Sequence, residues 1–466
     1  MSGYYADRCV RQRLTEFLGG DILGHATAVY VTHTDGCHYD RGELHPPQEL
    51  EWFFERDLDI ARSLADTESH LLHLDLEYVN FDSPGESYTN PQRCFELQEP
   101  VVRVIESLLL EWGIHPLHIV TGQGHHFVWR IARSSQAASE IQALCLSEEL
   151  TALCLERLPP DLVGRITAAD QTFFAALALV IEFVAHRIKE QAVAGCALPV
   201  EITAVHVGPR FSRQREMISI DLSEYGDPLH TRMIRLPFTN YRKPWVTGLA
   251  SALGIADKIP SFRTVPLHEI DFTQALKIRQ VENAVLDLAR RACVRIPLQE
   301  EGTLRLIDDY RASRLRRLHE DFYATGHGSP ADWEASYGRS ALDALPPCAR
   351  HLLVFPNDLL LKPAGMQLVT RCLLAQGWHP RHIAGLIRHK FEDPAYGWGV
   401  NWGDYVAAVR ADFYTRLFAC LHRTGIDLLV DFNCTSTQEK GFCFRPDGSS
   451  CRLEPSRQTL LTQLAP

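Results

Sequence analysis

A short alternating segment near residue 75 is the strongest constraint on how this chain folds. Residues 72–78 carry an apolar side chain at every second position, the period of a β-strand with one buried face. Asp75 and Glu77 therefore lie side by side on the opposite face. Two neighbouring carboxylates on a strand repel each other unless a cation such as Mg²⁺ lies between them. An ordinary solvated acidic face has the same pattern, so this segment alone leaves both interpretations open.

Length and composition are typical of a soluble globular protein. The 466 residues suffice for two or three domains, and 45% hydrophobic and 23% charged residues are ordinary values. The formal net charge of -11 argues against binding of nucleic acid by bulk positive charge, although it permits a locally basic groove. The first residues lack the apolar stretch of a secretory signal, and the apolar run 173–181 is too short to span a bilayer. We therefore expect a cytoplasmic location, no membrane contact, and a buried helix in that run.

A glycine-rich turn follows between two further predicted strands, residues 117–120 and 126–131. The turn residues are Thr121, Gly122, Gln123, Gly124 and His125. Glycines allow a turn to expose backbone N–H groups to an anion, and the side chains of Thr121 and His126 add donors. Such a turn suits a triphosphate, although most glycine-rich turns only close hairpins.

A third carboxylate and a cationic segment come later in the chain. Residues 217–222 alternate as a strand, with Asp221 on the face opposite to the apolar residues. Residues 232–244 then carry four cationic side chains, with Phe238 and Tyr241 among them. These cations can neutralise phosphates, but an exposed basic loop has the same composition.

In their order, the three motifs resemble those of the archaeo-eukaryotic primase superfamily, particularly the small catalytic subunit of two-subunit primases. The resemblance covers roughly residues 65–250. It implies an α+β fold with a primase-type, RRM-like catalytic core and surrounding helices. It also implies that Asp75, Glu77 and Asp221 are catalytic and hold two divalent ions, Mg²⁺ or Mn²⁺. The nucleotide-binding residues that it implies are Thr121, Gly122, Gly124, His126, Arg235, Asn240 and Lys243. Thr121 replaces the usual serine, and the zinc knuckle often found in the small subunit is not evident.

Four of the cysteines predict a metal centre near the C-terminus. There are thirteen cysteines, an odd and mostly scattered number, which argues against a disulfide framework. The four candidate ligands are Cys348, Cys434, Cys443 and Cys451. Four thiolates suit a [4Fe–4S] cluster or a Cys₄ zinc site. Cys372 and Cys420 fall on apolar helical segments and are predicted core residues.

The spacing of these cysteines resembles the C-terminal iron–sulfur domain of the primase large subunit, which favours the [4Fe–4S] cluster over Zn²⁺. The aromatic-rich segment that usually follows the last cysteine is missing here. We expect residues 1–255 to form the catalytic domain, with residues 1–68 mainly helical. Residues 256–340 are expected to form a helical connector, which carries a basic helix face. Residues 341–466 are expected to form an all-helical iron–sulfur domain.

The resemblance implies a DNA primase or primase-polymerase that makes a primer on single-stranded DNA from nucleoside triphosphates. Two alternatives remain at this point. One is a nucleotidyltransferase that extends ends in repair or defence. The other is a non-catalytic nucleic-acid-binding protein that has the same fold.

Overall fold

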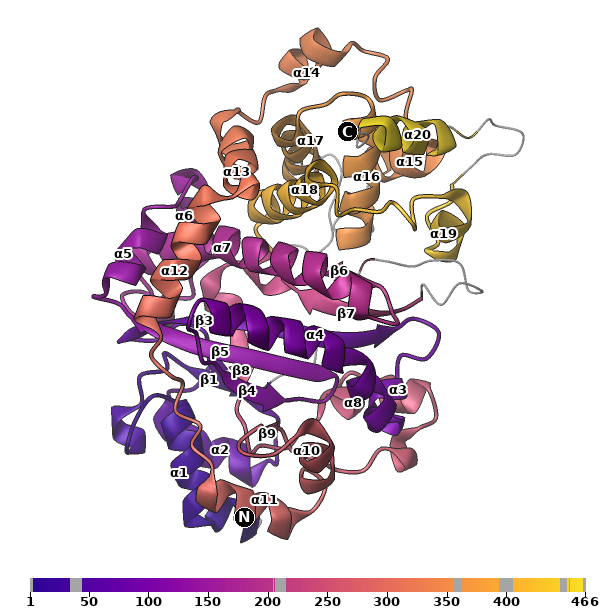
Figure 1. The fold of residues 1–466 in the computed structure, drawn as a ribbon. Coiled ribbons are helices and arrows are strands. Elements are labelled where there is room, and N and C mark those ends of the chain that lie inside the picture. The colour runs from indigo at the N-terminus through magenta and orange to yellow at the C-terminus, as the bar shows by residue number, and fades with distance from the viewer. Residues whose placement is uncertain are drawn as a thin grey trace.

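The computed structural model describes residues 3–33, 44–203, 205, 215–355, 360, 362–393, 405–444, 451 and 453–463. The chain has a mixed α+β fold with two sheets, which confirms the predicted α+β class. Figure 1 shows the larger sheet in the middle of the molecule and the C-terminal helices together at one end. The N-terminus lies at the opposite end.

The larger sheet has six strands in the order β6-β7-β3-β5-β4-β9. The strands are β3 (Ser69–Asn80), β4 (Leu117–Val120), β5 (Gly124–Ala132), β6 (Val200–Ile202), β7 (Glu216–Asp221) and β9 (Val265–Pro266). All neighbours in this sheet are antiparallel except β6 and β7. The strands predicted from alternation therefore exist, and β3 lies between β5 and β7.

Two long helices cover one face of this sheet, α4 (Pro91–Glu111) and α7 (Ala168–Ala192). Phe95 of α4 packs edge-on against His125 of β5, and Phe173 of α7 stacks on His70 of β3. The side chains of Leu72, Leu74, Leu76 and Tyr78 point to this covered face and are buried. The acidic side chains of β3 consequently point to the other face.

Residues 1–68 contain two short strands in addition to the expected helices. Helices α1 (Arg8–Phe17) and α2 (Leu50–Glu55) are present, but β1 (Val31–His33) and β2 (Ile60–Ser63) are strands. They form a three-stranded sheet with β8 (Met233–Arg235), in the order β1-β2-β8. All four residues of β2 are buried, so the alternation that marks a half-exposed strand is missing there. Helix α2 ends at Glu55, and Asp57 just beyond it has a φ of 51°, outside the right-handed helical region.

The remaining α-helices before residue 256 are short. They are α3 (Glu86–Thr89), α5 (Gln136–Gln142), α6 (Glu148–Leu155), α8 (Lys243–Val246) and α9 (Leu249–Ala252).

Helix α7 is longer than the predicted apolar run. The segment Ala168–Gly195 is long and apolar enough to cross a membrane by composition, and 78% of its most apolar window is buried inside the protein. The run is thus a buried helix, as predicted, while the cytoplasmic location stays a prediction.

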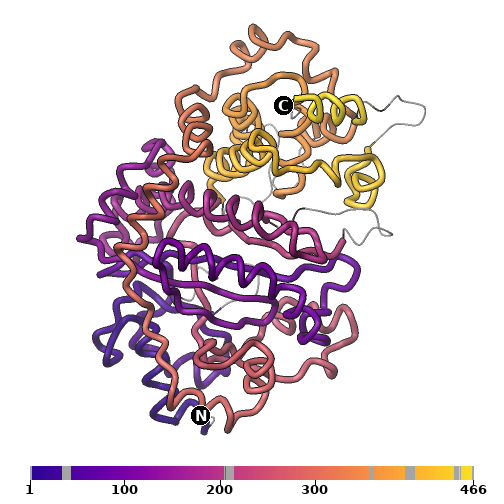
Figure 2. The backbone as a smooth tube through the Cα atoms, in the orientation of Figure 1, coloured from indigo at the N-terminus to yellow at the C-terminus, as the bar shows by residue number. Residues whose placement is uncertain are grey.

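Residues 256–340 are not purely helical. They form α10 (Phe272–Ile278), α11 (Glu282–Arg291), α12 (Glu300–Ala312), α13 (Arg314–Ala324) and α14 (Pro330–Tyr337), but also β9, which pairs with β4 of the larger sheet. In Figure 2 the chain after α11 runs along one side of the molecule to the C-terminal helices. The predicted domain boundary at residue 255 remains a prediction. Strand β9 lies after this boundary in the sequence but belongs to the larger sheet.

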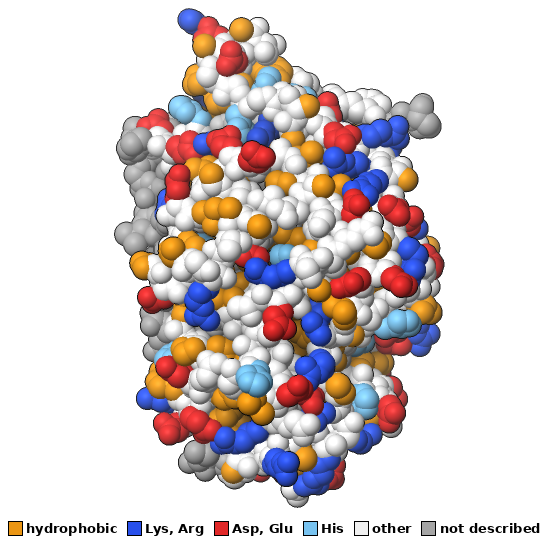
Figure 3. Space-filling view, turned by 90° about the vertical axis from the view of Figure 1, so that its left-hand side faces the viewer, with side chains coloured by type: hydrophobic (Ala, Val, Ile, Leu, Met, Phe, Trp, Pro, Cys, Tyr) orange, Lys and Arg blue, Asp and Glu red, His pale blue; other side chains and the backbone are white. Residues whose placement is uncertain are grey.

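The predicted basic helix face is interrupted, and two of its arginines form ion pairs. Ser313 separates α12 from α13 and caps the second helix. Arg311 forms an ion pair with Glu140, and Arg316 forms one with Glu320. On the side of the molecule that Figure 3 shows, acidic and basic side chains are interspersed.

Helices make up the regular structure in the described part of residues 341–466. They are α15 (Pro347–Val354), α16 (Pro363–Ala375), α17 (Pro380–Glu392), α18 (Ala407–Thr424), α19 (Cys434–Glu439) and α20 (Leu453–Gln463). Helix α18 packs against α16 and α17. It also contacts α7, because Arg416 of α18 forms an ion pair with Glu182 of α7. The C-terminal helices thus contact the main helix that covers the sheet.

Candidate active site

Strand pairing gathers the three predicted catalytic acids on one face of the larger sheet. Asp75 of β3 is the direct partner of Asp221 in β7 and of His126 in β5. Direct partners in antiparallel strands project to the same face, and so does Glu77, two residues along β3. The site therefore rests on three adjacent strands, which fix the backbone of each acid.

Lys243 approaches this face from outside the sheet. It begins α8, and its Nζ lies 3.7 Å from Oε1 of Glu77. The same Nζ donates a hydrogen bond of 2.7 Å to Oε1 of Gln123 in the glycine-rich turn. The nearby Glu77 carboxylate raises the pKa of Lys243 although burial opposes this, so the side chain is a cation at neutral pH.

The acids repel one another in the absence of a cation. Burial, followed by Glu77 and Asp221, raises the pKa of Asp75 well above its ordinary value. Burial and Glu77 also raise the pKa of Asp221, although that carboxylate accepts hydrogen bonds from the backbone N–H and hydroxyl of Ser223 at 2.9 and 3.0 Å. Oδ1 of Asp75 is buried and has no hydrogen-bond partner within the described ranges. A buried carboxylate oxygen that accepts no hydrogen bond is a suitable ligand for Mg²⁺ or Mn²⁺.

His126 completes the row as a neutral imidazole. Its Nε2 lies 3.5 Å from Oδ1 of Asp75. Burial and the neighbouring His73 lower the pKa of His126 well below its ordinary value. A neutral imidazole beside the acids can donate one hydrogen bond to a phosphate oxygen.

Two residues that the sequence interpretation missed line the same face. His73 packs edge-on against His126, with ring centroids 4.6 Å apart, and its Nδ1 lies 2.9 Å from Oε1 of Glu224. His73 precedes Asp75 by two positions, so strand alternation already places it on the acidic face. Glu224 lies in the 3₁₀ turn Ser223–Gly226, where no periodicity marks it.

The glycine-rich turn has a steric reason for its glycines. A Cβ on Gly124 would come within 1.7 Å of the carbonyl oxygen of Leu76, and a Cβ on Gly122 within 2.3 Å of the Tyr241 ring. The hydroxyl of Thr121 donates to the carbonyl oxygen of Gly124 at 3.1 Å and so closes the turn. Binding of an anion by these three residues stays a prediction.

The other two predicted nucleotide ligands contact acids near β2. Nε of Arg235 lies 3.1 Å from Oδ2 of Asp59, and its guanidinium lies 4.8 Å from the centre of the Tyr241 ring. The side-chain amide of Asn240 donates to Oδ1 of Asp57. The structure therefore brings Asp75, Glu77, Asp221, His126 and Lys243 together, and it directs the Asn240 amide to Asp57.

The four predicted cysteine ligands are neighbours. Sγ of Cys434 lies 3.7 Å from Sγ of Cys451, and Cys443 contributes to the electrostatic environment of Cys434. Burial, followed by Cys451, raises the pKa of Cys348 to about 12. Two thiolates 2.3 Å from one tetrahedral zinc ion lie about 3.8 Å apart, so the pair at residues 434 and 451 fits a shared metal. Cys372 is also within electrostatic range of Cys348 and Cys451.

Comparison with known proteins gives no independent assignment. No family model, no curated protein sequence and no solved structure matches this chain. The interpretation of the site therefore depends on its geometry and on the resemblance of its three motifs.

Proposed function

We propose that this protein is a DNA primase or primase-polymerase, which synthesises a primer on single-stranded DNA from nucleoside triphosphates. The observation that carries the proposal is the pairing of Asp75 with Asp221 beside Glu77, with a buried and unsatisfied Oδ1 on Asp75 among the described residues. A protein without metal-dependent chemistry gains nothing from this repulsion, which lowers the stability of the sheet.

The residues of the chain divide the work of nucleotidyl transfer. Asp75, Glu77 and Asp221 would hold Mg²⁺ or Mn²⁺, which neutralises charge on the triphosphate and makes the attacking hydroxyl more acidic. Lys243 supplies a permanent positive charge beside these acids, and neutral His126 supplies a hydrogen-bond donor. Arg235 lies close enough to lower the pKa of His126, and it adds positive potential to the site.

We further propose that Cys348, Cys434, Cys443 and Cys451 hold a metal centre. The resemblance to the primase large subunit favours a [4Fe–4S] cluster. The 3.7 Å separation of two of the thiols favours zinc, because it matches the separation expected on one tetrahedral ion. Iron and sulfide analysis after anaerobic purification distinguishes the two occupants.

Incorporation of labelled nucleotides on a single-stranded template, with and without an annealed primer, tests the catalytic proposal. We expect primer-independent synthesis by the wild-type protein in Mg²⁺ or Mn²⁺. Replacing Asp75 by asparagine should raise the barrier by about 4 kcal/mol, equivalent to a loss of about 1000-fold in rate. The matched control is Glu68→Gln, an acid just before β3 and outside the acidic row, which should keep wild-type activity.

Each alternative function has its own result in this assay. Synthesis that requires the primer would indicate an end-extending nucleotidyltransferase of repair or defence. Binding of single-stranded DNA without any incorporation would indicate a non-catalytic nucleic-acid-binding protein. Equal incorporation by wild-type protein and Asp75→Asn would contradict the assignment of the site.

A further inference from the structure

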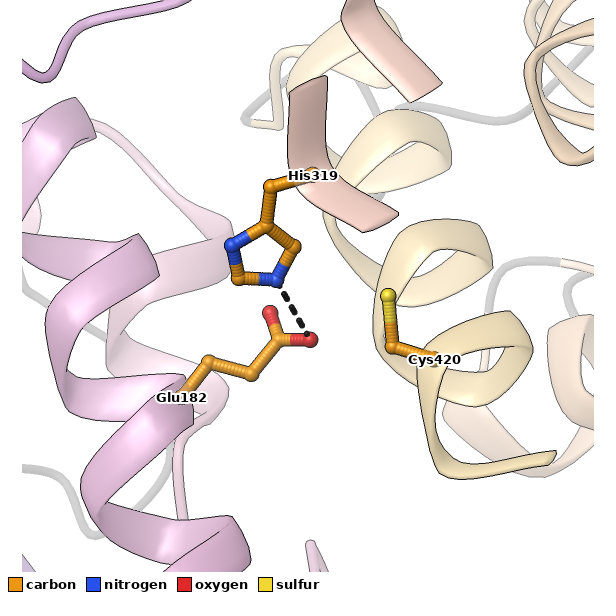
Figure 4. A group of neighbouring side chains, drawn as sticks. All are labelled: Glu182, His319 and Cys420. Carbon is orange, nitrogen blue, oxygen red and sulfur yellow. Dashed lines mark ion pairs between the residues drawn. The ribbon is translucent and has the colours of Figure 1, made fainter. Parts of the chain in front are cut away.

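A second group of metal-ligand side chains lies at the junction of three helices. Glu182 of α7, His319 of α13 and Cys420 of α18 point toward one another in Figure 4. One ligand atom from each lies within 4.8 Å of the others, and all three residues are buried. None of them belongs to the proposed active site or to the four-cysteine centre.

We propose that Glu182, His319 and Cys420 form a structural zinc site. Oε1 of Glu182 and Nε2 of His319 lie 3.2 Å apart. In the metal-free protein the two atoms form an ion pair, the dashed line in Figure 4, and neither has another polar partner among the residues that the structure describes. Oxygen and nitrogen ligands at about 2.0–2.1 Å from one tetrahedral zinc ion are separated by about 3.3 Å. The pair therefore has the spacing of two ligands of one ion, and an ion bound between them would replace their direct ion pair.

The other polar contacts of both ligands leave these two atoms to pair with each other or to bind a metal ion. Nδ1 of His319 lies 2.9 Å from the hydroxyl of Tyr310, so a proton on Nδ1 leaves the lone pair of Nε2 free. Nε of Arg416 donates to Oε2 of Glu182 at 3.0 Å, which leaves Oε1 for the group. Hydrogen bonds of this kind orient ligands in protein zinc sites and fix the histidine tautomer.

The charges and the donor set suit zinc. Zinc is a borderline-soft ion that accepts carboxylate, imidazole and thiolate ligands together. Binding would release the thiol proton of Cys420 to solvent, because cysteine coordinates as the thiolate. Arg416 already offsets the charge of Glu182, so the metal-free protein can hold the same residues as a buried polar cluster. The alternative to a zinc site is therefore a metal-free polar cluster, and the experiment must distinguish the two.

His186 lies close to the group but is not part of it. It lies one turn along α7 from Glu182 and interacts electrostatically with both Glu182 and His319. Its Nε2 is buried and lacks a hydrogen-bond partner in the described part of the chain. The side chain also lines a cavity of about 570 Å³, together with Arg187 and Ser313. The cavity therefore lies beside the group, while Glu182, His319 and Cys420 are not among the residues that line it.

Zinc content and X-ray absorption test the site without any measurement of nucleotide incorporation. We expect wild-type protein to hold zinc whose absorption spectrum requires nitrogen or oxygen ligands in addition to sulfur. Changing Cys420 to alanine should remove one equivalent of zinc per chain and lower Tm. The matched control is Cys94→Ala, a buried cysteine on α4, which should keep the zinc.

The wild-type spectrum decides the question even when Cys420→Ala fails to fold. Absence of zinc would overturn the proposal. A zinc ion with sulfur ligands alone would overturn it too, because such an ion would belong to the four C-terminal cysteines. An unchanged zinc content in folded Cys420→Ala would overturn it as well. None of these outcomes depends on the proposed primase activity, so the two proposals fail separately.

Discussion

Asp75 of β3 lies directly opposite Asp221 of β7, and burial raises the pKa of both carboxyl groups. Like charges that face each other across two strands destabilise a sheet. The sheet core around them is well formed, since the apolar side chains on the other face of β3 are buried under α4 and α7. The arrangement thus lowers stability locally, and the divalent cation that we propose for this site would offset the repulsion.

The first prediction is that Mn²⁺ stabilises the protein through this pair. A ligand that binds only the folded state at 100 times its Kd adds about 2.7 kcal/mol to the free energy of unfolding. We expect MnCl₂ to raise the Tm of wild-type protein and to raise that of Asp221→Asn much less. Thermal unfolding with a chelator and with MnCl₂ measures the difference. Glu68→Gln should respond as the wild type does, and an equal shift in Asp221→Asn would exclude the pair as the binding site.

Alternation along single strands made one part of this site predictable. The spacing of Asp75 and Glu77 already places both carboxylates on one face of a strand. Sequence patterns do not say which strands become neighbours, so the pairing with Asp221 rested on the order of motifs in a resembling family. Glu224 and the pairing of Asn240 with Asp57 have no local signal, because both depend on how distant loops pack.

The fold shows the same limit. Strand β2 has no alternation because it is buried on both faces, and two-residue β9 is too short to have a period. The grouping of Glu182, His319 and Cys420 arises from the packing of three helices. Tertiary packing alone brings these residues together, and the spacing of the three along the chain carries no metal-binding pattern.

The second prediction concerns Lys243. Its Nζ lies near Glu77 and bonds to Gln123, so its charge is directed toward the acidic face. We expect Lys243→Ala to weaken nucleoside triphosphate binding at least tenfold, a free-energy cost of about 1.4 kcal/mol, with little effect on single-stranded DNA binding. Fluorescence titrations with a labelled nucleotide and a labelled oligonucleotide separate the two. The exposed Lys258→Ala is the control, and loss of DNA binding alone would make Lys243 a template contact.

The third prediction concerns the buried ion pair of Arg62 and Asp66, whose Nη2 and Oδ2 lie 2.7 Å apart. Burial alone would raise the pKa of Asp66, but Arg62 holds it below the ordinary value of 3.8. A carboxylate with a lowered folded-state pKa contributes stability above its unfolded pKa, and this contribution is lost as the pH falls through the folded value.

We therefore expect Asp66→Asn to reduce the free energy of unfolding by about 3 kcal/mol at pH 7, because it leaves Arg62 buried without its counter-charge. The difference from wild type should shrink as the pH falls below 4. Denaturant titrations at both pH values measure it, with the exposed Asp161→Asn as control. A difference that does not change with pH would show that the ion pair is not its cause.

The last prediction separates cysteine ligands from core cysteines near the C-terminus. Cys348 lies at the start of α15. The other three cysteines, Cys434, Cys443 and Cys451, come after α16, α17 and α18 in the sequence. A metal centre that joins them closes a long loop and constrains the unfolded chain, as a cross-link does. We expect Cys348→Ser to lower metal content and to destabilise the described part of residues 341–466, while β3 and its acids stay folded.

Cys372 provides the sharper control because it is buried on α16 within electrostatic range of Cys348 and Cys451. Because Cys372 is a core residue, Cys372→Ser should leave the iron, sulfide and zinc content unchanged. Cys420→Ser should leave the iron and sulfide content unchanged. Metal and sulfide analysis, with hydrogen exchange across the C-terminal helices and β3, measures both effects. Loss of metal from Cys372→Ser would show that Cys372 is a ligand, since a buried thiol beside two ligand thiols can replace a more exposed one such as Cys443.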